Sequence, residues 1–114
     1  MHSLETNYSV RSKSETLLSY INQNLDKKIT VEELANLVNL SPDYLAVQFK
    51  SIIGFTIIQY INRCRIDQAK VLMVNEDMLI KEVAAKVGFG DEFYFSKTFK
   101  KYEGMSPREF LIWH

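Results

Sequence analysis

Two stretches of the chain share a pattern in which a short amphipathic helix, a turn and a second amphipathic helix follow one another. In the later stretch, four apolar residues recur at the i, i+3, i+4 and i+7 positions that share one helix face: Ile80, Val83, Ala84 and Val87. Gly88 predicts the end of this helix, because glycine readily adopts the left-handed conformation that terminates helices.

The residues that follow predict a second helix with an aromatic inner face. Asp91 is a typical N-cap residue. Three aromatic residues then fall on one side of the helix: Phe95, Phe99 and Tyr102. Gly104 supplies the next stop signal. A helix, a tight turn and a second helix together predict a helix-turn-helix unit.

The earlier stretch, residues 31–60, repeats this arrangement. Its first helix carries apolar residues that align with those of the later copy: Val31, Leu34, Ala35 and Val38. After a turn that is one residue shorter, Phe49 and Lys50 align with Phe99 and Lys100. A solenoid needs about three or more repeats, so two copies predict a duplicated unit.

Changes in the pattern divide the chain into four predicted segments. Residues 1–13 are polar and lack periodic apolar positions, so we expect a linker or a disordered tail there. Ser12 and Glu15 predict a capping box for a helix that runs to about Leu25. The division is a tail at 1–13, a first helix-turn-helix subdomain at 14–54, a connecting helix at 55–75 and a second subdomain at 76–114.

Capping signals predict the starts of other helices. Thr30 with Glu33 forms a second capping box, and Ser106 with Glu109 forms a third. Ser41 precedes a proline, which costs nothing at the first helical position because its missing N–H has no partner there.

The connecting helix is expected to bury a broad apolar stripe: Ile57, Ile58, Ile61, Cys64, Ala69 and Leu72. The last helix is expected to fold three residues over the second core: Phe110, Leu111 and Trp113.

Composition narrows the classes of function. No apolar run approaches the roughly 18 residues of a membrane span, so we expect no membrane contact. One cysteine and two histidines leave no metal-ligand cluster, and we expect neither a metal nor a cofactor. No nucleophile pairs with a histidine and no glycine-rich loop suits a phosphate, so we expect no enzyme. The lone Cys64 fits a reducing cytoplasm.

The charge balance complicates a nucleic-acid function. Fourteen basic and fourteen acidic residues give a formal net charge of zero, whereas nucleic-acid domains usually show a basic excess. Residues 55–75 carry three basic residues against one acidic residue, and residues 91–103 carry three of each. We expect modest affinity for phosphates, with useful occupancy requiring a second protomer or an attached domain.

The later copy contains a spaced set of residues that is hard to assemble by chance: Ala84, Gly88-Phe89, Tyr94-Phe95-Ser96, Phe99-Lys100 and Gly104-x-Ser106-Pro107. With this set the chain resembles the DNA-binding domain of the AraC/XylS family of bacterial transcription regulators. The resemblance covers roughly residues 14–113, and the first copy is the more degenerate one. The resemblance implies an all-α fold of about seven helices, with two helix-turn-helix subdomains joined by one long central helix.

The same resemblance implies sequence-specific binding of double-stranded DNA in the bacterial cytoplasm, without a cofactor. In that family each unit offers its second helix to DNA. A connecting helix of about eighteen residues at ~1.5 Å per residue would let both enter successive major grooves, about 34 Å apart. It further implies RNA polymerase contact in the full regulator and a sensor or dimerisation domain outside this chain.

Outward positions on the two second helices are the candidate DNA contacts. If Leu45, Phe49 and Ile52 face inward, the outward residues of the first are Asp43, Ala46, Val47 and Lys50. The family often carries arginine at the position of Val47. Ala46 and Val47 suit a thymine methyl group and Asp43 suits a cytosine amine, while backbone docking or shape readout is the alternative.

On the second of these helices, the outward residues are Glu92, Phe93, Ser96, Lys97 and Lys100. Lys97 stands where the family usually has arginine, so it keeps the charge but loses the planar fork. Phe93 either contacts a thymine methyl group or packs on the turn. Lys100 suits a phosphate contact or a solvated charge better than a contact with a base.

Three further residues are candidate phosphate contacts. Arg65 either meets a phosphate or lies on a solvated, ion-paired face. Ser106 opens the last helix, whose free N–H groups with Arg108 suit a DNA phosphate, unless that helix is only a structural lid. The alternative to DNA binding is a helix-turn-helix module specialised for protein–protein interaction, with weak or no DNA binding. Zero net charge, Asp43, Val47 and Phe93 favour this alternative.

Overall fold

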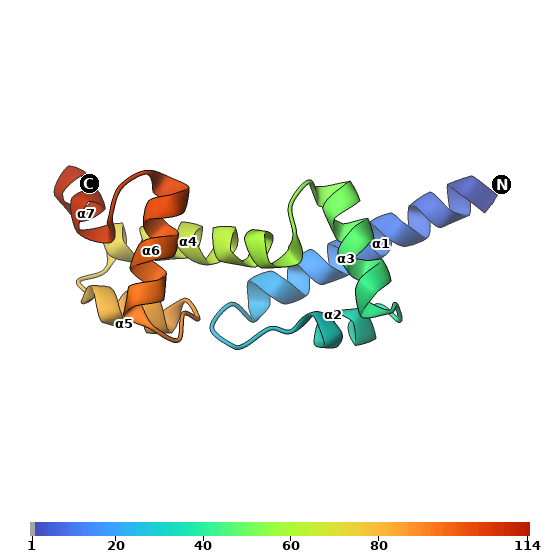
Figure 1. Cartoon of the computed structure of the whole chain (residues 1–114), viewed down its shortest axis with the longest axis horizontal. Coiled ribbons are helices and arrows are strands. Elements are labelled where there is room, and N and C mark those ends of the chain that lie inside the picture. Colours follow the sequence, from blue (N-terminus) through green and yellow to red (C-terminus); the bar gives the residue numbers. More distant parts are fainter. Residues whose placement is uncertain (1) are drawn as a thin grey trace. The chain divides into compact units, whose positions relative to one another are not determined.

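The computed structural model describes the backbone of residues 2–114 and the side chains of residues 13–114. Within this range the chain is all-α, as predicted (Figure 1). Its seven helices are α1 (His2–Gln23), α2 (Val31–Leu37), α3 (Pro42–Ile53), α4 (Ile57–Asn75), α5 (Ile80–Lys86), α6 (Glu92–Glu103) and α7 (Pro107–Trp113).

Helix α1 starts earlier than the sequence pattern predicts. It begins at His2, so the expected start near Ser12 is wrong, and residues 2–13 are helical instead of forming an irregular tail. The segment holds no proline or glycine to interrupt a helix, and a capping signal inside a helix-compatible run does not by itself force a start.

The described chain divides into two compact units. The first comprises Met1–Asn24 with Ile29–Gln59, and the second comprises Leu25–Lys28 with Tyr60–His114. Most of α4 therefore lies in the second unit. Among the described residues no single helix is long and apolar enough to cross a bilayer; only α3 and α4 taken together, with a bend between them, reach that length and hydropathy.

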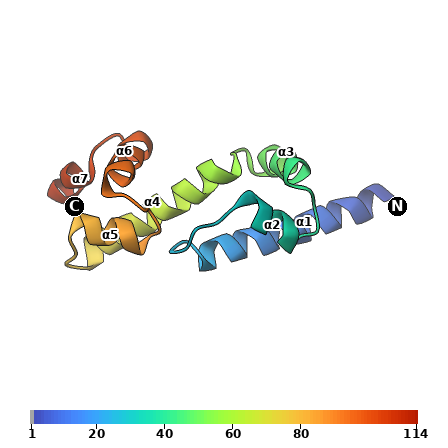
Figure 2. The same ribbon diagram turned by 60° about the horizontal axis from the view of Figure 1, so that its bottom comes forward.

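Helices α1, α2 and α3 build the first unit (Figure 2). Thr30 caps α2 in the predicted capping box. The Tyr20 hydroxyl and the Thr30 N–H both donate to the Glu33 carboxylate and lower its pKa. The buried residues are Leu17, Ile21, Leu34, Ala35, Val38, Leu45, Phe49 and Ile57.

One inward prediction for the first unit is wrong. Ile52 is 46% exposed, although its spacing from Leu45 and Phe49 places it near their face. It lies in the last turn of α3, where left-handed Gly54 turns the chain away, so no further helical turn covers it.

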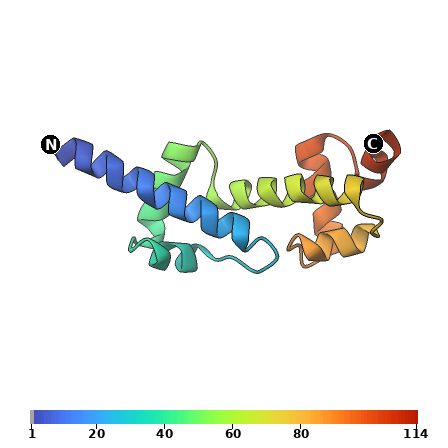
Figure 3. The ribbon, with the colours of Figure 1, turned by 180° about the vertical axis from the view of Figure 1, so that it is seen from behind.

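Most of α4, together with α5, α6 and α7, builds the second unit (Figure 3). Aromatic rings form the centre of this unit. Ring centroids lie 5.2 Å apart between Phe89 and Phe95, 5.8 Å between Phe95 and Phe99, and 5.4 Å between Phe99 and Phe110. Around them lie the buried aliphatic residues Ile66, Ala69, Met73, Val83, Ala84 and Val87. The predicted inner faces of α5 and α6 are therefore confirmed at Val83, Ala84, Val87, Phe95 and Phe99.

The predicted stripe on α4 is only partly right. Ile58 is 63% exposed, and the sequence pattern missed Ile66 and Met73, which are buried. One stripe was expected, but the buried residues of α4 belong to two cores: Ile57 lies in the first unit, and Ile66 and Met73 lie in the second.

The last helix buries less than predicted. Phe110 is buried, but Leu111 is 40% and Trp113 is 75% exposed. The inner face of α7 continues from Phe110 to His114, whose ring stacks on Phe110 with centroids 4.2 Å apart. Trp113 therefore points away from the core that it was expected to cover.

Candidate nucleic-acid interface

Helices α3 and α6 are built in the same way. Each has 12 residues, starts at a side-chain cap and ends at a left-handed glycine. Ser41 Oγ accepts from the Tyr44 N–H in α3, and Asp91 Oδ1 accepts from the Phe93 N–H in α6. Residues fifty apart in the sequence consequently hold equivalent positions on the two helices.

The predicted contact face of α3 lies in solvent. Leu45 and Phe49 are buried beneath the helix. The four outward residues are all exposed: Asp43, Ala46, Val47 and Lys50. Val47 stands out because its apolar side chain is 66% exposed at the middle of this face. The outward position of these residues is confirmed, and their contacts with bases or phosphates stay predictions.

The predicted contact face of α6 is also exposed. Glu92, Phe93, Lys97 and Lys100 lie in solvent, and Ser96 is half-buried. Phe93 is 79% exposed, so it does not pack on the turn, which was one of the two alternatives for this residue. An aromatic ring held in solvent at the start of the helix is free to meet a partner.

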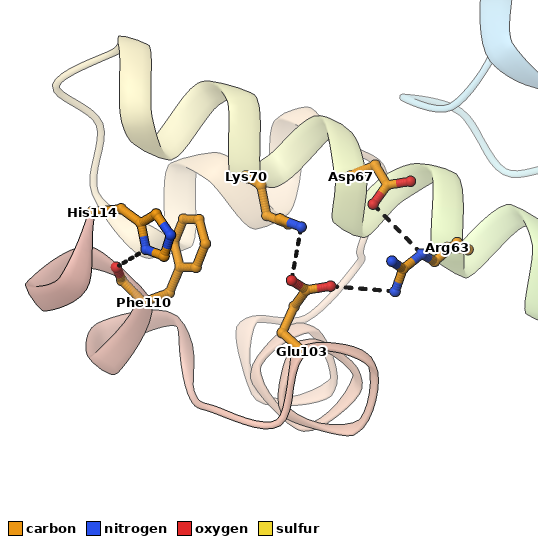
Figure 4. A network of polar contacts seen from close by, with 6 residues as sticks. All are labelled: Arg63, Asp67, Lys70, Glu103, Phe110 and His114. Carbon is orange, nitrogen blue, oxygen red and sulfur yellow. Dashed lines mark hydrogen bonds and ion pairs between the residues drawn. The ribbon is translucent and has the colours of Figure 1, made fainter.

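Ion pairs change the local charge of α6. Glu103, at the end of the helix, lies 2.8 Å from the Lys70 Nζ and 3.3 Å from the Arg63 Nη1 of α4 (Figure 4). Arg63 also pairs with Asp67 at 3.6 Å. Because Glu103 is neutralised by α4, the exposed lysines of α6 outweigh its remaining acidic residues.

Arg65 has a structural position. Its Nε donates to the Leu25 carbonyl at 3.1 Å and its Nη2 donates to the Lys27 carbonyl at 2.8 Å. The guanidinium lies 5.9 Å from the centroid of the Phe89 ring, and burial lowers its pKa. Arg65 thus holds Leu25–Lys28, the segment after α1, within the second unit. Sequence reasoning missed this function, and a phosphate contact by Arg65 stays a prediction.

The start of α7 is capped as predicted. Ser106 Oγ accepts from the Glu109 N–H, and Glu109 Oε1 accepts from the Ser106 N–H. These bonds lower the pKa of the Glu109 carboxyl, so a negative charge already lies at this helix start. Arg108 is exposed beside it. A phosphate contact by Ser106 or Arg108 stays a prediction.

A pair of tyrosines at equivalent positions was missed. Tyr44 is 50% exposed on α3, and Tyr94 is 47% exposed on α6. The Tyr94 hydroxyl accepts from Asn62 Nδ2 at 3.3 Å, and its ring lies 5.7 Å from Phe89. The sequence signal was the recurrence of tyrosine fifty residues apart.

Comparisons with known proteins agree with this arrangement. Residues 34–111 match the helix-turn-helix domain family. The chain is 33% identical over 96 residues to the bifunctional transcriptional activator/DNA repair enzyme AdaA of Bacillus subtilis, covering 84% of this chain and 46% of that protein. It is 37% identical over 100 residues to the arabinose operon regulatory protein of Salmonella typhimurium, covering 87% and 36%. The chain thus spans less than half the length of these relatives.

Solved structures share the fold. The C-terminal domain of the response regulator yesN from Fusobacterium nucleatum superposes with a TM-score of 0.82 at 29% identity, covering 86% of this chain and 96% of that one. The DNA-binding domain of AdpA, solved with a target DNA, superposes with a TM-score of 0.82 at 24% identity, covering 86% and 88%. At that identity the second likeness concerns the fold alone.

Proposed function

The chain belongs to the AraC/XylS family of transcription regulators as a helix-turn-helix DNA-binding domain, and we propose that it places α3 and α6 in successive major grooves of double-stranded DNA. The observation that carries the proposal is the duplicated outer helix, with an N-cap, a buried inner face and an exposed outer face in both copies. The AdpA domain of the same fold, solved with a target DNA, supports it.

The outer side chains divide into base-reading and phosphate-binding groups under this proposal. Outward residues of the first turn and the middle of α3 and α6 reach base edges. Lysines near the ends of these two helices, an arginine of α4 and the start of α7 reach phosphates. The base-reading group is Asp43, Ala46, Val47, Glu92, Phe93, Ser96 and Lys97. The phosphate-binding group is Lys50, Arg65, Lys100, Ser106 and Arg108.

The domain acts within a longer regulator, in our proposal, because its relatives extend well beyond the matched part. An attached sensor or dimerisation domain raises occupancy of the DNA by supplying a second binding module. The full regulator contacts RNA polymerase and works in the bacterial cytoplasm. The domain itself needs no cofactor and catalyses no reaction, although its relative AdaA is also named a repair enzyme.

Replacing Lys97 with alanine tests base reading by α6. We expect binding to weaken by about 1–3 kcal/mol and selectivity to relax at one base step, because a base-reading side chain discriminates only at its own position. Fluorescence anisotropy on duplexes that differ at single base pairs measures both effects.

Lys100→Ala is the matched comparison, since it removes the same charge from the same helix. If Lys100 contacts a phosphate, its removal weakens binding equally on all sequences. The slope of log affinity against log salt concentration then becomes shallower by about one. If Lys97→Ala also weakens every duplex equally, Lys97 binds phosphate and does not read a base.

The second candidate function is protein–protein interaction. It is favoured by two apolar side chains held in solvent, Val47 and Phe93. A domain of this kind would bind a protein partner through these residues and would show no affinity for random duplex DNA at low salt.

A further inference from the structure

At the middle of its exposed face, α3 carries an apolar side chain, whereas α6 carries a cationic one. The inference drawn below from this difference rests on the proposed function. Val47 is the sixth residue after the cap of α3, and Lys97 is the sixth residue after the cap of α6. Both side chains are exposed, and in the sequence each is flanked at two residues on either side by buried residues of the inner face. The two positions are therefore equivalent in geometry but not in what they can recognise.

The outer face of α3 offers little to a hydrogen-bonding base edge. Val47 is 66% exposed and Ala46 beside it is exposed, so the centre of the face is apolar. The charged residues of α3 lie toward its two ends, Asp43 in the first turn and Lys50 in the last. The apolar feature of the major groove is the C5-methyl group of thymine, which suits an aliphatic side chain.

The outer face of α6 offers a cation at the same place. Lys97 is exposed, and Lys100 and Lys101 follow in the last turn. Glu103, the acidic residue at the end of α6, is paired with Arg63 and Lys70 (Figure 4). A lysine ammonium suits the O6 and N7 acceptors of guanine.

We propose that Val47 on α3 reads a thymine through its methyl group, whereas Lys97 on α6 reads a guanine. The preferred DNA site is then asymmetric, with thymine and guanine at equivalent positions of its two halves. Shape readout and backbone docking do not depend on the methyl group, so chemical editing of the DNA separates them from this proposal.

The test starts with duplexes selected by the domain from a random-sequence pool. Each thymine of a selected duplex is replaced in turn by deoxyuridine, which removes only the methyl group. We expect one position of the α3 half to lose about four-fold in affinity, as burial of one methyl group is worth roughly 0.8 kcal/mol. For the Val47→Ala variant, the same replacement of thymine by deoxyuridine is expected to lower the affinity by less than about two-fold, because the shorter side chain does not cover the methyl group.

Val74→Ala is the matched control, because Val74 is also an exposed valine but lies on α4, outside the contact faces of α3 and α6. It is expected to keep the four-fold loss at the α3 position. Replacing guanines by 7-deazaguanine removes the N7 acceptor; we expect about five-fold loss at one position for the parent domain, corresponding to about 1 kcal/mol, and none for Lys97→Ala.

The outcomes separate this inference from the proposed function. If the domain selects duplexes but no thymine is sensitive to loss of its methyl group, the inference is overturned and DNA binding stands. The inference is equally overturned if Val47→Ala keeps the parent's sensitivity at every thymine. If no duplex is selected at all, the proposed function fails first. Circular dichroism checks that each variant is folded.

Discussion

Replacing Phe99 with alanine is expected to lower the free energy of unfolding by about 3–5 kcal/mol. Phe99 has no exposed surface and packs edge-on against Phe95 and Phe110, with centroids 5.8 and 5.4 Å away. Its removal would leave a cavity at the centre of the second unit. The loss is a large part of the roughly 5–15 kcal/mol that stabilises a typical domain.

Phe93→Ala controls for the loss of a phenylalanine from the same helix. Phe93 is 79% exposed, so we expect a change within about 0.5 kcal/mol. Urea denaturation followed by circular dichroism measures both variants. Equal destabilisation by the two substitutions would mean that the inner and outer faces of α6 are assigned wrongly.

Replacing Gly88 with alanine is expected to cost about 3–5 kcal/mol, through backbone strain and overpacking together. Gly88 has a φ of +98°, a backbone conformation that residues with a side chain rarely adopt. A Cβ atom there would lie 1.9 Å from the Leu25 carbonyl oxygen and 2.9 Å from Arg65 Nε. The substitution would push away the segment that Arg65 holds in place.

Gly104→Ala separates strain from overpacking. Gly104 has a φ of +79°, but a Cβ atom there meets nothing within 4 Å. We expect a cost of only about 1–2 kcal/mol, from the left-handed backbone alone. Comparable losses in the two variants, measured by urea denaturation, would contradict the close approach of Leu25 to Gly88.

Helix starts were predictable because their signals are local. Thr30, Ser41, Asp91 and Ser106 all cap helices as the sequence indicated. Each cap bonds a backbone N–H two or three residues later, so the information lies within one helical turn. The start of α1 was missed because no breaker residue marks it.

The exposed faces of α3 and α6 were also predictable, since the 3.6-residue period places Val47 and Lys97 opposite their buried neighbours. The contacts of Arg65 were not. Arg65 bonds the carbonyl of Leu25, forty residues earlier, and no local pattern reports such a pairing. The exposure of Trp113 was missed for a related reason. Hydrophobicity alone does not show which face of a short helix packs against the core.

Salt dependence of binding to random duplex DNA tests DNA recognition most directly. Fluorescence anisotropy at several salt concentrations gives the log–log slope, which counts the phosphates that the domain neutralises without knowledge of its target sequence. We predict a slope steeper than about −3, as two helices contacting the backbone displace several counterions. No binding at low salt, or a slope near zero, would contradict DNA recognition by this domain and favour a protein partner.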